Sequence, residues 1–116
     1  MQSMISKASG WVLAAGLLCS PAHAAPGAAQ RLVDECRLKT VYCEGFLSGV
    51  IETAVLSGQY LLMVSGARWM CMPEDLSHEQ ARGFLLAYHQ ARPKDVVYTP
   101  GVYVMNVLEA NFPCTP

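Results

Sequence analysis

Charged residues are scarce in this chain and form no basic cluster. Lysine and arginine number 8, aspartate and glutamate number 9, and the net charge over 116 residues is −1. Proteins that bind nucleic acid or anionic lipid surfaces neutralise phosphates with several clustered cations. The composition therefore argues against nucleic acid as a partner and gives no reason for membrane binding by the exported protein.

The chain also lacks the motifs that hold metals, haem or phosphate groups. It has no pair of C-x-x-C units, no C-x-x-C-H and no glycine-rich phosphate loop. His78-Glu79 begins like the zinc motif H-E-x-x-H, but Arg82 occupies the position of the second histidine. We therefore expect no metal and no cofactor.

Catalytic residue combinations are missing as well. Ser48 lacks the preceding glycine of the G-x-S-x-G nucleophile motif. The carboxylate pairs Asp34-Glu35 and Glu74-Asp75 are adjacent in sequence, and adjacent residues on a helix do not face each other. His89 has no orienting partner that the sequence identifies. The sequence predicts a binding protein and not an enzyme.

The N-terminus has the order of a secretory signal. Lys7 precedes an apolar run over 11–18, and Ala22-His23-Ala24 follows as a small-x-small cleavage site. The run is shorter than the roughly 20 residues that span a bilayer. We predict a signal peptide over residues 1–24, a flexible tether over 25–30 and a single helical domain over 31–116.

Four cysteines follow the expected cleavage site, namely Cys36, Cys43, Cys71 and Cys114. A domain of this size buries a smaller share of its surface than a larger one, so an added crosslink is expected. An exported protein meets an oxidising compartment, where disulfides persist. Four thiols allow three pairings.

Apolar residues spaced three and four apart predict a helix over residues 31–38 and a stronger one over 42–56. Ser57-Gly58 is expected to end the second helix. The connector over 59–74 follows, and its apolar run over 60–64 fits either a short strand or an extension of the helix.

Two further helices have clear end signals. Ser77 and Gln80 have the spacing of a capping box, and Arg92-Pro93 ends the helix that they begin. Thr99-Pro100 begins the last helix and Pro113 ends it. The sequence therefore predicts an all-α fold, a small disulfide-stapled bundle of three to four main helices.

The short link between the last two helices makes them an antiparallel hairpin, with Cys71 and Cys114 at the same end. This favours a Cys71–Cys114 disulfide and leaves Cys36 to pair with Cys43. Residues seven apart on a straight helix lie about 10 Å apart along its axis, beyond disulfide reach, so the second pair requires a break near Lys39-Thr40. If that helix is straight, Cys36 and Cys43 must instead pair with the other two cysteines.

Gly45, Ser48 and Gly49 form a small-residue patch on the helix over 42–56. Each interior glycine costs about 1 kcal/mol relative to alanine, which close approach of another backbone would offset. We expect that backbone to be another helix of the same chain, with a second copy in a homodimer as the alternative.

Four ordered sequence blocks resemble the Rap/Tai family of type VI secretion immunity proteins. They are Cys43-Glu44-Gly45-Phe46-Leu47-Ser48-Gly49-Val50, Cys71-Met72-Pro73, Arg92-Pro93 and Asn111-Phe112-Pro113-Cys114. The resemblance covers nearly the whole chain after the signal. It implies an all-helical periplasmic protein, without catalytic residues, that binds and inhibits a peptidoglycan-cleaving amidase effector.

Contact residues cannot be carried over from this resemblance, because the family varies most where its members touch their effectors. Aromatic and arginine anchors dominate inhibitor interfaces, and the two connectors carry such residues. We expect partner contacts at Gln59, Tyr60, Arg68 and Trp69 in the first connector and at Lys94, Asp95 and Tyr98 in the second. Burial of Trp69 in the core beside Cys71 is the alternative for that residue. A periplasmic helical chaperone without a dedicated toxin partner is the alternative function.

Overall fold

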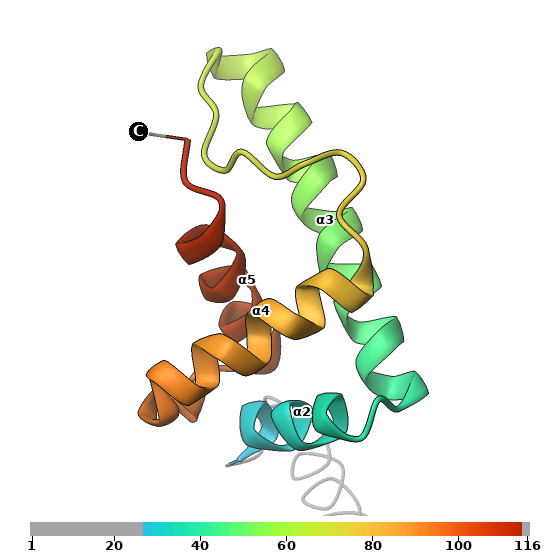
Figure 1. Cartoon of the computed structure of the whole chain (residues 1–116). Coiled ribbons are helices and arrows are strands. Elements are labelled where there is room, and N and C mark those ends of the chain that lie inside the picture. Colours follow the sequence, from blue (N-terminus) through green and yellow to red (C-terminus); the bar gives the residue numbers. More distant parts are fainter. Residues whose placement is uncertain (1–26, 115–116) are drawn as a thin grey trace, which may run out of the picture.

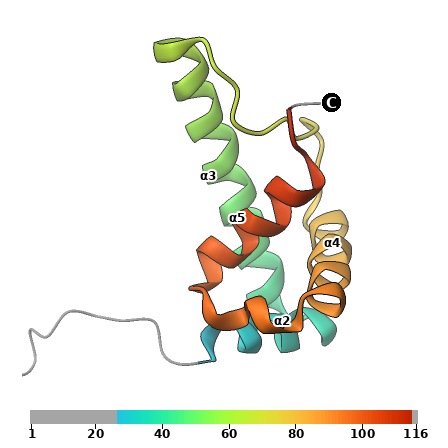
Figure 2. The same ribbon diagram turned by 90° about the vertical axis from the view of Figure 1, so that its left-hand side faces the viewer.

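The computed structural model describes residues 27–114, and its regular elements are all helical (Figures 1 and 2). The expected signal peptide lies outside the described residues. The elements are α2 (Ala28–Arg37), α3 (Val41–Ser65), α4 (His78–Ala91), the 3-10 helix η1 (Pro93–Val97) and α5 (Pro100–Asn111). The prediction of a small all-α domain stapled by disulfides is confirmed.

Helix α2 begins earlier than the sequence analysis expected. Ala28, Ala29 and Gln30, assigned to a flexible tether, form its first turn, and Ala29 is fully buried. Alanine has the highest helix propensity, and Ala29 extends the apolar stripe of Leu32 and Val33 by one turn. The tether prediction is therefore wrong for residues 28–30.

A sharp corner joins α2 to α3. Lys39 has a left-handed backbone conformation (φ 55°), and the Thr40 side chain caps α3 by accepting a hydrogen bond from the Cys43 backbone N–H at 3.3 Å. The corner brings the Cα atoms of Cys36 and Cys43 to 5.0 Å, where the two residues form a buried disulfide. This is the break near Lys39-Thr40 that the pairing required.

Helix α3 ends nine residues later than predicted, because the apolar run over 60–64 is helical. Ser57-Gly58 resembles a helix end, but Gly58 keeps a helical conformation and Gly66 is the left-handed residue at the end of α3 (φ 70°). The backbone N–H of Gly66 donates to the carbonyl oxygen of Leu62 at 2.9 Å. The choice left open for residues 60–64 is therefore settled in favour of the helical extension.

The C-terminal helices form as their end signals predicted. Ser77 and Gln80 make a complete capping box, with each side chain accepting from the backbone N–H of the other. Arg92 and Thr99 flank η1, which turns the chain so that α5 runs back along α4 (Figure 2). The segments before α4 and after α5 lie at the same end of this hairpin, where the Cys71–Cys114 disulfide joins them.

The core lies where α2, the first half of α3, α4 and α5 meet. Tyr88 packs edge-on against the buried Tyr103, with ring centroids 5.7 Å apart. The last buried residue of α3 is Ala54. Beyond it, the outer half of α3 projects past the other helices, and the connector runs back beside this arm (Figure 1). We call residues 55–65 the α3 arm.

Candidate partner-binding surface

A concave surface lies between the α3 arm and the connector that follows it. It is an open groove of about 600 Å³, and its apolar lining includes Ala54, Val55, Leu62, Met70, Met72 and Pro73. Polar side chains are few, and they come from Gln59, Arg68 and Glu74. An apolar concavity with a few polar groups is the usual form of a binding site.

Three contacts hold the connector in place as the second wall of the groove. Cys71 is bonded to Cys114, and its backbone N–H donates to the carbonyl oxygen of Phe112 at 2.9 Å. The Trp69 ring packs against Gly58 of α3, where an added Cβ would lie 3.4 Å from the indole nitrogen. The position of this wall therefore depends on the Cys71–Cys114 disulfide at one point and on the absence of a side chain at Gly58 at another.

The first group of expected contact residues lies at this groove. Gln59, Arg68 and Trp69 line it, and Tyr60 is exposed on the adjoining side of the arm. Trp69 is half-buried, and its indole N–H is shielded from solvent without a hydrogen-bond partner among the described residues. Trp69 thus combines both expectations, since it packs against α3 and also lines an open surface.

The second group lies at the opposite end of the molecule, in and next to η1 (Figures 1 and 2). Lys94 and Tyr98 are exposed. The Asp95 carboxylate accepts a 2.7 Å hydrogen bond from the Tyr88 hydroxyl, which gives Asp95 a structural role. The seven expected contact residues therefore do not form one surface.

The small-residue patch faces away from the rest of the chain. Gly45 and Gly49 are exposed, and a Cβ added at either would meet nothing within 4 Å. The expectation that these glycines admit another helix of the same chain is therefore wrong. The glycine that does admit a neighbouring segment is Gly58, which the sequence analysis treated as a helix end.

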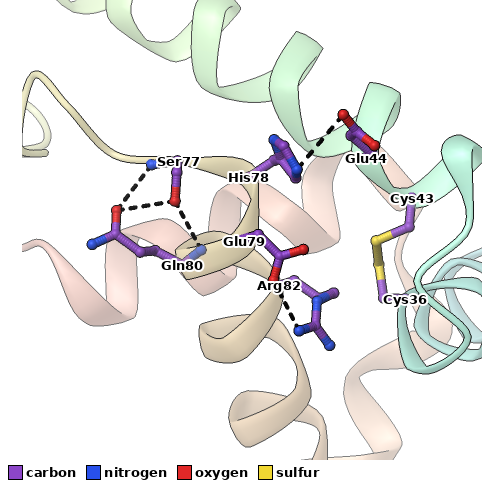
Figure 3. A network of polar contacts seen from close by, with 8 residues as sticks. All are labelled: Cys36, Cys43, Glu44, Ser77, His78, Glu79, Gln80 and Arg82. Carbon is purple, nitrogen blue, oxygen red and sulfur yellow. Dashed lines mark hydrogen bonds and ion pairs between the residues drawn. A yellow bond between two sulfur atoms is a disulfide. The ribbon is translucent and has the colours of Figure 1, made fainter.

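Polar side chains gather at the junction of α3 and α4 (Figure 3). His78 Nε2 lies 3.7 Å from Glu44 Oε1, and Arg82 bonds Glu79 at 3.1 Å. The hydrogen bond from Arg82, together with its charge, lowers the pKa of the exposed Glu79 carboxyl below its usual value. These pairs are surface links next to the capping box, and no group of three metal-binding side chains occurs in residues 27–114.

Several groove residues were missed by sequence reasoning. Met70 and Met72 are partly buried against the core, and both also line the groove. Ala54 and Val55 line the groove from α3. The sequence carried one signal for these groove residues. This part of the chain has more apolar residues than the single buried face of an amphipathic helix requires.

Helix α3 is also long and apolar enough to cross a membrane by length and composition alone, and it is the only such helix among the described residues. Its first half is tied into the domain, because Cys43, Leu47 and Ala54 are buried and Cys43 is bonded to α2.

The described residues form a disulfide-stapled helical domain with an open apolar groove beside a projecting arm, a form that suits the binding of a partner. The chain belongs to the family of Rap1a immunity proteins, whose model matches residues 14–114. Comparison with curated proteins and with solved structures gives no match. Immunity proteins of this family bind effectors and do not catalyse reactions, so the chain is an immunity protein and not an enzyme.

Proposed function

We propose that this immunity protein acts in the periplasm, after removal of its signal peptide, against a peptidoglycan-cleaving amidase of a type VI secretion system. The amidase class is supported by the four sequence blocks that resemble Rap/Tai immunity proteins. The periplasmic location is supported by the signal-like N-terminus and by two disulfides, since such bonds persist in oxidising compartments.

The groove beside the α3 arm is the observation that indicates how this protein would inhibit its effector. It offers an apolar surface, one arginine and one tryptophan whose N–H has no partner in the described structure. Aromatic and arginine side chains in partly desolvated pockets contribute most to inhibitor interfaces. We infer that the groove receives a segment of the effector and that the bound immunity protein blocks substrate access.

The test is titration of purified type VI secretion amidases, beginning with any that a neighbouring gene encodes, with the purified, oxidised protein, measured as hydrolysis of peptidoglycan fragments. Inhibition should saturate at a fixed molar ratio. Arg68→Glu changes an exposed side chain in the groove and should raise the inhibition constant at least tenfold, since truncating one hot-spot residue costs about 2 kcal/mol or more.

Lys94→Glu is the matched control, because it makes the same charge change at the η1 end. It should leave inhibition unchanged. Equal losses in both variants would place the effector elsewhere or indicate a general charge effect. Absence of inhibition by the unmodified protein would refute the amidase assignment and leave the family membership intact.

The exposed arm also favours the alternative of a periplasmic chaperone. Leu56 and Met63 expose large apolar side chains of the kind that binds unfolded clients. A chaperone would suppress aggregation of unrelated denatured proteins and would show no fixed stoichiometry with an amidase. Suppression of aggregation without binding to any amidase would favour this second function.

A further inference from the structure

The second wall of the groove is attached to the rest of the domain at few points. This wall is the connector between the α3 arm and α4, and residues 67–72 of the connector belong to no helix. Within the described part of the chain, a single backbone hydrogen bond joins these residues to a distant segment, from the Cys71 N–H to the carbonyl oxygen of Phe112. The Cys71–Cys114 disulfide lies at the same point. The attachment of the wall is therefore concentrated at Cys71.

The other side of this attachment is fixed to the core. Helix α5 buries Val107 and Leu108 near its end, and Phe112 packs edge-on against Phe84 of α4, with ring centroids 5.3 Å apart. Cys114 follows Phe112 by two residues. The disulfide thus ties a segment without regular structure to one that the packed helices hold in place. Breaking the bond would free the connector and leave α5 where it is.

The two disulfides differ in their access to solvent. Cys36 and Cys43 are buried, with exposed fractions of 0% and 1%, whereas Cys71 is exposed and Cys114 is half-buried. Thiol–disulfide exchange requires a thiolate to reach one sulfur of the bond. A dissolved thiol can therefore attack at Cys71, while the bond that staples α2 to α3 is shielded.

We propose that the Cys71–Cys114 disulfide is a redox switch of the groove, which is complete when the bond is formed and loses its second wall when a dithiol reduces it. A thiolate of the dithiol attacks Cys71 Sγ, and Cys114 leaves as a thiolate. The second thiol of the reductant then displaces Cys71 from the mixed disulfide. Two electrons and two protons pass from the dithiol to the protein, which gains two thiols, and the dithiol becomes a disulfide.

The helices should stay packed in the reduced state. The core comes from α2, the first half of α3, α4 and α5, and of the described buried residues the connector contributes Leu76 alone, at its junction with α4. The disulfide between α2 and α3 is untouched. Met70 and Met72 are only partly buried, so little holds residues 67–72 once the outer bond is broken.

The switch would couple partner binding to the redox state of the compartment. Disulfides persist in oxidising compartments, whereas the cytosol keeps thiols reduced, so the groove would be complete only after export. This consequence rests on the proposed binding of an effector at the groove. The switch itself does not depend on the identity of the partner.

The experiment compares the oxidised protein, expressed from the full chain and purified after export, with the same protein reduced by dithiothreitol until mass spectrometry finds two thiols. Amide exchange measured by nuclear magnetic resonance reports the attachment directly. The exchange rate of the Cys71 amide should rise about tenfold or more on reduction, since the loss of one hydrogen bond changes a local opening equilibrium by about that factor. Amides of α4 and α5 should keep their protection, and reoxidation should restore that of Cys71.

Trp69 reports the state of the groove, because it is the only tryptophan in residues 27–114 and it lines the groove beside Gly58. Acrylamide should quench its fluorescence more strongly after reduction, since the ring loses its packing against α3. The double variant Cys71→Ser with Cys114→Ser is the control. It should show the quenching of the reduced protein and should not respond to dithiothreitol.

Unchanged exchange at Cys71 and unchanged quenching of Trp69 in the reduced protein would overturn the proposal. Loss of protection throughout α4 and α5 at the same step would also overturn it, because the bond would then hold the whole fold. Where the oxidised protein inhibits an amidase, reduction should abolish the inhibition. An oxidised protein that inhibits no amidase but shows both responses to dithiothreitol would refute the proposed function and support the switch.

Discussion

The Cys71–Cys114 disulfide should provide a large part of the stability of this domain. Its cysteines are 43 positions apart. In the chain-entropy model, a loop of that length stabilises the folded state by about 4 kcal/mol, because the crosslink restricts the unfolded chain. The Cys36–Cys43 bond has a separation of 7 and should contribute about 2 kcal/mol by the same relation.

The perturbation is the double variant Cys71→Ser with Cys114→Ser, which removes both cysteines of this bond. Cys71 is exposed and Cys114 is half-buried, so replacing sulfur with oxygen adds little cavity or desolvation cost. The free energy of unfolding should fall by about 4 kcal/mol. The assay is urea unfolding followed by far-ultraviolet circular dichroism under non-reducing conditions.

Mild reduction of the unmodified protein provides a second route to the same state. The reductant reaches the exposed Cys71 before the buried Cys36 and Cys43, so thiol counting by mass spectrometry should first find two thiols, at Cys71 and Cys114. Trp69 lies two residues from Cys71, and its fluorescence should change with this first step. A loss below about 1 kcal/mol in the serine variant would refute the loop-entropy argument.

Three further outcomes follow from single contacts. Tyr103→Phe should raise the free energy of unfolding by about 1 kcal/mol in urea titrations, because the buried Tyr103 hydroxyl has no partner among the described residues; a loss of similar size would show that the hydroxyl is bonded. Burial raises the pKa of Tyr103 from 10.0 to about 12, so the unfolded chain loses the Tyr103 proton first and the free energy of unfolding falls as the pH rises from 10 toward 12. Alkaline unfolding curves should show this fall for the unmodified protein and not for Tyr103→Phe. Ser77→Ala should lower the thermal midpoint through a loss of about 1 kcal/mol, and Ser77→Thr, which keeps the hydroxyl, should restore most of it.

Local end signals made the C-terminal helices predictable. Ser77 with Gln80, and proline after Arg92 and Thr99, act through the backbone of their own neighbours, and the structure shows all three ends where the sequence placed them. Gly58 shows the opposite case. A glycine after serine is a common helix end, but here the chain continues as helix and uses Gly58 to admit Trp69, which is eleven residues away.

The candidate surface was only partly predictable, because it too depends on contacts between residues that are far apart in the sequence. Gln59, Arg68 and Trp69 could be chosen by residue type, and they come together at the groove. Lys94 and Tyr98 satisfied the same criterion but lie at the far end, because η1 is packed beside α2 and α4. Residue type indicates which side chains suit an interface, whereas only the packing of the helices determines which of them share one.

The unequal spans of the two disulfides also set an order for oxidative folding. Cys36 and Cys43 are separated by a short segment that ends at the Thr40 cap, so they meet at low entropic cost while the chain is largely unfolded. Cys71 and Cys114 meet only after α4, η1 and α5 have brought the chain back on itself. Formation of the Cys71–Cys114 bond therefore reports that folding is complete, and chains that lack it remain open to proteolysis.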